Sequence, residues 1–316
     1  MTRLDAPAVE SLVAELKSTP PGQFQKVVGH LRNLTRYHGL NGGVAEREAM
    51  LDDTPGLAVL WLCHPSGYHR EAALRRIESV DAAPLLLALV LWRMNDWVPH
   101  VRKAADLCLQ RVIGEFDAAA LKPLVPVLAL RVPSWGRHRQ GAEGLLSAPT
   151  GLPGILRDEP GRSAVLDYVL ETAAGPVAKV LRRALTTGGF DADLPRIARD
   201  ARNGGARQIA VETLLSGRAV WSRGYGRQWV DKTQGESRRV PLLEVRRLDL
   251  TVDRDAILTS ALADPFARVR LSAVWAMTRD GVPPAVGPLL PALRSDKSRS
   301  VREAVDFLNR KFAETS

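Results

Sequence analysis

The sequence has few of the residues that metal binding, disulfide formation or thiol chemistry require. Its two cysteines, Cys63 and Cys108, are too few for a disulfide framework and are not spaced as metal ligands, so we expect small buried hydrophobic side chains at both positions. Of the six histidines, His64 and His69 are five residues apart, whereas ligands on one helix face are three or four apart. These absences predict a protein without a bound metal or cofactor.

The sequence also lacks common catalytic motifs and the features of membrane proteins. It contains no phosphate-binding Gly-Lys-Ser or Gly-Lys-Thr loop, no Gly-x-Gly-x-x-Gly and no Gly-x-Ser-x-Gly. The longest apolar stretch, Pro84–Trp92, ends at Arg93 and is well short of the roughly 20 residues that cross a bilayer. Asp5, Glu10 and Glu15 interrupt the N-terminal segment, which therefore has no signal-peptide core. We expect a cytoplasmic protein that does not contact a membrane.

Aromatic residues are scarce, at 5% of the chain, and runs of β-branched residues are sparse. Strands therefore have little to build from, whereas alanine, leucine and arginine recur at helical spacing. Hydrophobic and charged contents of 45% and 25% are ordinary for a folded protein. The composition predicts an all-α fold.

Two pairs of segments repeat at an interval of 32 residues, which aligns Arg70 with Arg102 and Arg270 with Arg302. Valine or histidine precedes each arginine, and alanine or valine follows it three places later. Five residues before that valine or histidine lie His64, Asp96, Asp264 and Asp296. A period of this size is typical of a helical solenoid, in which pairs of helices stack because one pair cannot bury its apolar face alone.

This pattern resembles HEAT repeats, in which an aspartate at the turn between two helices is followed by a Val-Arg pair on the second helix. The resemblance implies a right-handed α-solenoid of HEAT-like helix pairs. It also implies a ladder of Asp and Arg side chains along the stack, formed by Asp96, Arg102, Asp264, Arg270, Asp296 and Arg302. Each aspartate would cap the helix that follows it.

The repeat register divides the chain into four parts. We expect an N-terminal helical cap at 1–60, HEAT-like repeats at 61–217 and further repeats at 251–316. Between them, the register is lost in an irregular insertion at 218–250, which is rich in basic and aromatic residues.

The insertion is the best candidate binding site. The whole chain has a net charge of +9, with 36 arginines and 8 lysines, and residues 218–247 contribute eight basic and three acidic residues. Interleaved bases and rings suit a nucleic acid, because they stack on bases and neutralise phosphates. Alternatively, the rings pack onto the helices and the arginines reflect a GC-rich genome. The candidate residues are Trp221, Arg223, Tyr225, Arg227, Trp229 and Arg239.

A second candidate cluster comprises Trp97, Trp135, Arg137 and Arg139, which we expect near turns on one edge of adjacent units. With Asp96, this cluster is similar to HEAT-like DNA glycosylases that remove alkylated bases. By that resemblance Asp96 would stabilise a positively charged sugar, and the two tryptophans would hold the lesion. In the alternative interpretation, Asp96 is only a capping and ladder residue.

The first functional hypothesis is a non-catalytic scaffold that binds a protein partner, with arginine and tryptophan side chains as hot spots. Such a protein needs no active site. The alternative is a nucleic-acid-binding protein, with or without glycosylase activity. The sequence leaves the oligomeric state open.

Overall fold

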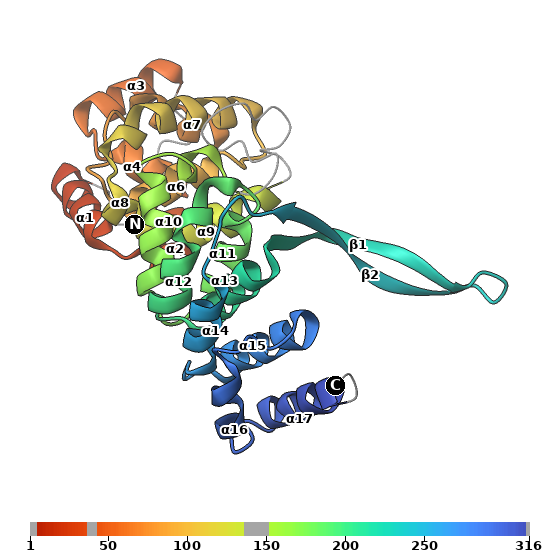
Figure 1. Cartoon of the computed structure of the whole chain (residues 1–316). Helices are drawn as coiled ribbons and strands as arrows, with labels where there is room; N and C mark the ends of the chain where they lie inside the picture. The colour runs from red at the N-terminus through yellow and green to blue at the C-terminus, as the bar shows by residue number, and fades with distance from the viewer. Residues whose placement is uncertain (1–4, 37–42, 136–151, 314–316) are drawn as a thin grey trace. The chain divides into compact units, whose positions relative to one another are not determined.

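The computed structural model describes residues 5–36, 43–135 and 152–313. The chain is mostly helical, as predicted, with a two-stranded sheet in its described part (Figure 1). It divides into two compact units. The N-terminal unit comprises 1–148 and 153–164, and the C-terminal unit comprises 149–152 and 165–316.

In the N-terminal unit, α1, α2 and α7 pack against α6 (Pro84–Arg93), an almost wholly apolar helix. Residues 85–91 of α6 are all buried, and they explain why the longest apolar stretch of the chain is not a membrane span. Helices α5 and α7 pack against each other, and α7 also packs on α6. The helices of this unit are α1 (Ala6–Ser18), α2 (Phe24–Thr35), α3 (Val44–Asp53), α4 (Leu57–Trp61), α5 (Gly67–Arg76), α6 (Pro84–Arg93), α7 (Pro99–Val112), α8 (Ala118–Leu121) and α9 (Val125–Leu130).

Helix α10 (Gly161–Glu171) leads into the C-terminal unit, in which α13, α15 and α17 pack in succession. Alanine and valine lie at the contacts, and Val269, Ala273, Val301 and Val305 are completely buried. The small side chains let these helices approach closely. The other elements are α11 (Val177–Ala184), α12 (Leu194–Asp200), α13 (Gly204–Ser216), β1 (Arg218–Asp231), β2 (Glu236–Arg247), α14 (Arg254–Leu262), α15 (Ala267–Asp280), α16 (Leu290–Leu293) and α17 (Arg299–Ala313).

At three places, an arginine donates two hydrogen bonds to the aspartate carboxylate of the next helix pair. In the N-terminal unit, both Arg70 Nε and Nη2 donate to the Asp96 carboxylate at 2.9 Å. In the C-terminal unit, Arg270 makes the same contact with Asp296 at 2.7 Å. The third pair is Arg207 with Asp264. Each arginine thus joins two successive helix pairs, because its Nη1 also donates to carbonyls of its own turn.

The arginines of the ladder differ from those that the repeat pattern implies. Arg102 and Arg302 donate to the carbonyls of Asp96 and Asp296 but form no ion pair among the described residues. Conversely, Arg70 is a full member, although His64 replaces the aspartate of its own turn. The aspartate that forms the ion pair with each of these arginines belongs to the following helix pair.

A second repeated contact, which the sequence analysis did not predict, uses a cation nine residues after the ladder arginine. In each case this cation donates to carbonyls at the end of the preceding parallel helix, where the backbone dipole is negative. Arg111 binds the Leu74 and Ile77 carbonyls at 2.7 and 3.0 Å. The other two contacts are Arg279 to Leu215 and Lys311 to Thr278. Part of the basic charge of the chain is therefore structural.

Replacing Arg111 with methionine is expected to lower the free energy of unfolding of the N-terminal unit by about 1–2 kcal/mol, because three hydrogen bonds to helix-end carbonyls disappear. Urea denaturation would measure the loss. The control Arg75→Met removes an exposed (i, i+4) pair with Glu71 and should cost less than about 0.5 kcal/mol. Equal losses in the two variants would contradict the structural role of Arg111.

Both cysteines are buried, as predicted, and burial raises the pKa of each thiol to about 11. Neither is therefore a reactive thiolate near neutral pH. Within the described residues, no cluster of histidine, cysteine or acidic side chains could hold a metal ion. No helix in those same ranges is long and apolar enough to span a bilayer.

Candidate functional site

The segment predicted to be an irregular insertion is a regular antiparallel hairpin, so this part of the fold prediction was wrong. Strands β1 and β2 pair from Arg218 opposite Arg247 to Asp231 opposite Glu236, with register shifts after Ser222 and after Trp229. The turn is stabilised by Asp231 and by Gly235, which adopts a positive φ of 71°. The sequence did not predict these strands, because the two bulges and the charged residues interrupt the alternation of apolar and polar side chains that is typical of a strand.

The base of the hairpin is fixed to the helices of the C-terminal unit. Both Arg246 Nη1 and Nη2 donate to the Asp191 carboxylate at 2.7 Å, and Nη2 also reaches the Leu185 carbonyl. The hydrogen bonds that Arg246 donates to Asp191 raise the pKa of Arg246. Where the strands leave the helices, the Leu248 amide donates to the Gly217 carbonyl at 2.9 Å. Beyond this anchor the ribbon extends away from the helices of its unit (Figure 1).

The two faces of the ribbon differ in charge. Side chains of opposed residues share a face, and successive pairs alternate between faces. By this register one face, which we call the arginine face, carries no acidic residue, whereas Asp231, Glu236 and Glu244 belong to the other. The arginine face consists of Arg218, Val220, Ser222, Tyr225, Arg227, Trp229, Ser237, Arg239, Pro241, Leu243, Val245 and Arg247.

Two stacked pairs order the outer half of the arginine face. The guanidinium of Arg227 lies 4.0 Å from the centre of the Trp229 ring, and that of Arg239 lies 4.5 Å from the Tyr225 ring. Arg227 Nε also donates to the Ser237 hydroxyl at 2.7 Å. These neutral partners orient the guanidinium groups without neutralising their charge.

Like charges face each other twice across the ribbon. Arg218 lies opposite Arg247, and Arg227 lies opposite Arg239. Like charges at opposed positions destabilise a sheet. None of the four arginines forms an ion pair with an acidic residue in the part of the chain that the structure describes. The stacked rings hold the guanidinium groups of Arg227 and Arg239 apart along the ribbon, and their charges remain available to an anionic ligand with several charges.

On the opposite face, acidic and basic residues occur together. Glu244 pairs with Arg223 at 3.1 Å and accepts a hydrogen bond from Trp221 Nε1 at 3.0 Å. Arg238 Nε donates to the side chain of Gln228. The structure thus brings together Tyr225, Arg227, Trp229 and Arg239 of the predicted residues, and separates Trp221 and Arg223 from them.

The second predicted cluster differs from the hairpin in that its acidic residue, Asp96, is buried. Asp96 is buried, with its carboxylate bound by Arg70, by Arg93 Nη1 at 2.7 Å and by the Val98 amide at 3.0 Å. Burial opposes ionisation, but the hydrogen bonds and charges of these groups hold the pKa of Asp96 below its ordinary value. Trp97 is 68% exposed. Trp135 is half-buried, and Arg137 and Arg139 lie outside the described residues.

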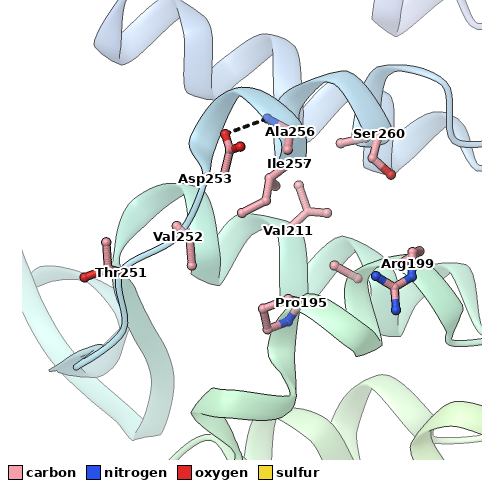
Figure 2. A pocket seen from close by; sticks show the side chains of 11 residues that line it. Pro195, Arg199, Val211, Thr251, Val252, Asp253, Ala256, Ile257 and Ser260 are labelled. Atoms are coloured by element: carbon pink, nitrogen blue, oxygen red, sulfur yellow. Dashed lines mark hydrogen bonds between the residues drawn. The ribbon is translucent and has the colours of Figure 1, made fainter.

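A pocket of about 410 Å³ in the C-terminal unit is lined by α12, α13, α14 and the segment before α14 (Figure 2). Its walls include Pro195, Val211 and Ile257. The charged side chains at its rim have other roles: Arg199 pairs with Asp200, and Asp253 caps α14 by accepting from the Ala256 amide. Its two hydroxyl side chains, Thr251 and Ser260, have no histidine beside them among the lining residues.

Comparison with known proteins assigns no family. No protein-family model matches this chain. No curated protein matches it either. The geometry of the hairpin and of the ladder is therefore the basis for the functional proposal.

Proposed function

We propose that this chain is a non-catalytic binding protein built of HEAT-like helix pairs, and that its β-hairpin binds nucleic acid. The arginine face carries the proposal, because four arginines occupy two pairs of opposed positions there without an acid. Phosphates at the spacing of a nucleic-acid backbone would neutralise several of them at once. The repeated contacts from Arg70 to Asp96 and from Arg270 to Asp296 support the HEAT-like part of the proposal.

A catalytic role has less support. The carboxylate of Asp96 receives four hydrogen bonds from Arg70, Arg93 and Val98, and its side chain is 1% exposed. A group that stabilises a sugar cation must reach the substrate. The geometry therefore favours a structural role for Asp96 over the glycosylase role.

A protein partner is the second candidate, and one observation favours it. The inner half of the arginine face exposes apolar side chains, with Leu243 at 59% and Val245 at 54% exposure. Exposed apolar groups beside arginine are typical of protein interfaces. Under this hypothesis the protein is a scaffold whose hairpin contacts an acidic surface of its partner.

Salt dependence distinguishes the two candidates. We expect a fluorescein-labelled DNA of about 20 base pairs to bind with micromolar or tighter affinity at roughly 50 mM salt. Affinity should fall about 100-fold at roughly 200 mM salt, because four neutralised phosphates release four counterions. Fluorescence anisotropy would measure both values. Absence of DNA binding at the lower salt concentration would refute the proposal and favour a protein partner.

A further inference from the structure

We infer that the arginine face lies in the major groove of double-stranded B-form DNA, where its paired arginines reach the phosphates of both strands. The inference rests on the proposed function, and it specifies which nucleic acid binds and how. Three observations support it: the positions of the four arginines, the stacking of the aromatic rings on arginine, and the shape of the ribbon.

The aromatic rings of the arginine face are each stacked on an arginine, and Tyr225 and Trp229 remain 61% and 44% exposed. Proteins that bind single strands stack successive bases on exposed rings. Here the guanidinium groups of Arg239 and Arg227 already cover one side of the Tyr225 and Trp229 rings. The rings thus support the arginines, which makes phosphate the expected contact.

The arginines occupy both edges of the ribbon. Arg218 and Arg227 belong to β1, while their partners Arg247 and Arg239 belong to β2. A ribbon of two strands fits the major groove of B-form DNA, which is about 12 Å wide and has phosphates along both sides. The major groove of A-form RNA is too deep and narrow for the same fit. The bulges after Ser222 and Trp229 increase the twist of the ribbon, as a path along a helical groove requires.

The distance between the two arginine pairs sets the length of DNA that is contacted. Eight residues separate Arg239 from Arg247 along β2. At about 3.3 Å per residue the pairs are roughly 26 Å apart, which corresponds to about eight base pairs. A shorter duplex would contact one pair alone.

The tip of the hairpin is polar and carries acidic residues, which argues against insertion into a membrane. Asp231 and Glu236 flank the turn, and Lys232, Thr233 and Gln234 lie within it. A membrane-inserting hairpin would place apolar side chains there. The ligand therefore lies along the face of the ribbon.

The test compares three fluorescein-labelled ligands of one sequence: duplex DNA, single-stranded DNA and duplex RNA. Wild-type protein should bind the DNA duplex at least about 10-fold more tightly than the others. The double variant Arg227→Gln with Arg239→Gln should weaken duplex binding by about 10- to 100-fold. Its matched control, Arg223→Gln with Arg238→Gln, removes the same charge from the opposite face and should change affinity less than about 3-fold.

Groove occupancy is read by dimethyl sulfate, which methylates guanine N7 in the major groove and adenine N3 in the minor groove. Protection of guanine N7 over about eight base pairs is expected. Equal affinity for single strands or RNA, protection of adenine N3 alone, or equal losses in the two double variants would overturn the groove inference while leaving nucleic-acid binding intact. Absence of binding to all three ligands, or binding to phosphatidylserine vesicles instead, would overturn both proposals.

Discussion

Replacing Asp96 with alanine is expected to lower the free energy of unfolding of the N-terminal unit by about 3–5 kcal/mol. The substitution leaves the guanidinium groups of Arg70 and Arg93 buried without a counter-charge, and these residues are only 3% and 5% exposed. Burial already lowers the pKa of Arg93 to about 10. Urea denaturation followed by tryptophan fluorescence would measure the loss, because Trp61 is fully buried in the same unit.

The control for Asp96 is Asp106→Ala on α7, which removes a carboxylate that accepts a hydrogen bond from the side chain of Gln110 and should change stability by less than about 0.5 kcal/mol. The loss from Asp96→Ala should also depend on pH. Because the pKa of Asp96 is lowered in the folded state, its stabilising effect is present above the unfolded pKa near 3.9 and disappears as the pH falls through the folded value. A loss no larger than that of the control would contradict the structural role of Asp96.

Shortening the hairpin is expected to abolish DNA binding while leaving the helices intact. Replacing residues 222–243 with Asn-Gly joins Trp221 to Glu244, which are directly opposed, through a two-residue turn that favours this sequence. The deletion removes Arg227 and Arg239 with their stacked rings, and preserves the anchor from Arg246 to Asp191. Affinity for duplex DNA should fall by about 100-fold or more.

The shortened protein provides its own folding control. Most of the removed side chains are exposed, so its melting temperature and helical circular dichroism should remain close to wild type. A matched variant replaces only the turn at 232–235 with Asn-Gly and keeps the arginine face; it should bind DNA like the wild type. If the protein without residues 222–243 still binds DNA tightly, the binding site lies on the helices.

The sequence predicted the three acids of the ladder and one of its three arginines, but not the hairpin. A residue type that recurs every 32 residues on a helix occupies the same place in each helix pair, so the alignment of Arg70 with Arg102 indicated repeated contacts. Arg70 was left out of the expected ladder because His64 replaces the aspartate of its own turn, whereas its partner Asp96 belongs to the following helix pair. The repeated contact made by Arg111 could have been inferred from the sequence, since a basic residue also lies nine places after Arg270 and nine places after Arg302.

The candidate site was predicted in composition but not in geometry. The sequence indicated Tyr225, Arg227, Trp229 and Arg239 as candidate binding residues, yet it grouped them with Trp221 and Arg223. The separation of faces depends on the cross-strand register and on two bulges, each of which shifts the alternation of side chains. The anchor between Arg246 and Asp191 joins residues 55 apart, a contact that no local pattern encodes.

The most direct test of the proposed function is the salt dependence of duplex binding by the wild type and by the double variant Arg227→Gln with Arg239→Gln. If four arginines neutralise phosphates, the logarithm of the wild-type association constant should fall with the logarithm of salt concentration with a slope of about −3.6. Removing two of the arginines should reduce that slope to about −1.8. Equal slopes for the two proteins would contradict the arginine face as the DNA-binding site.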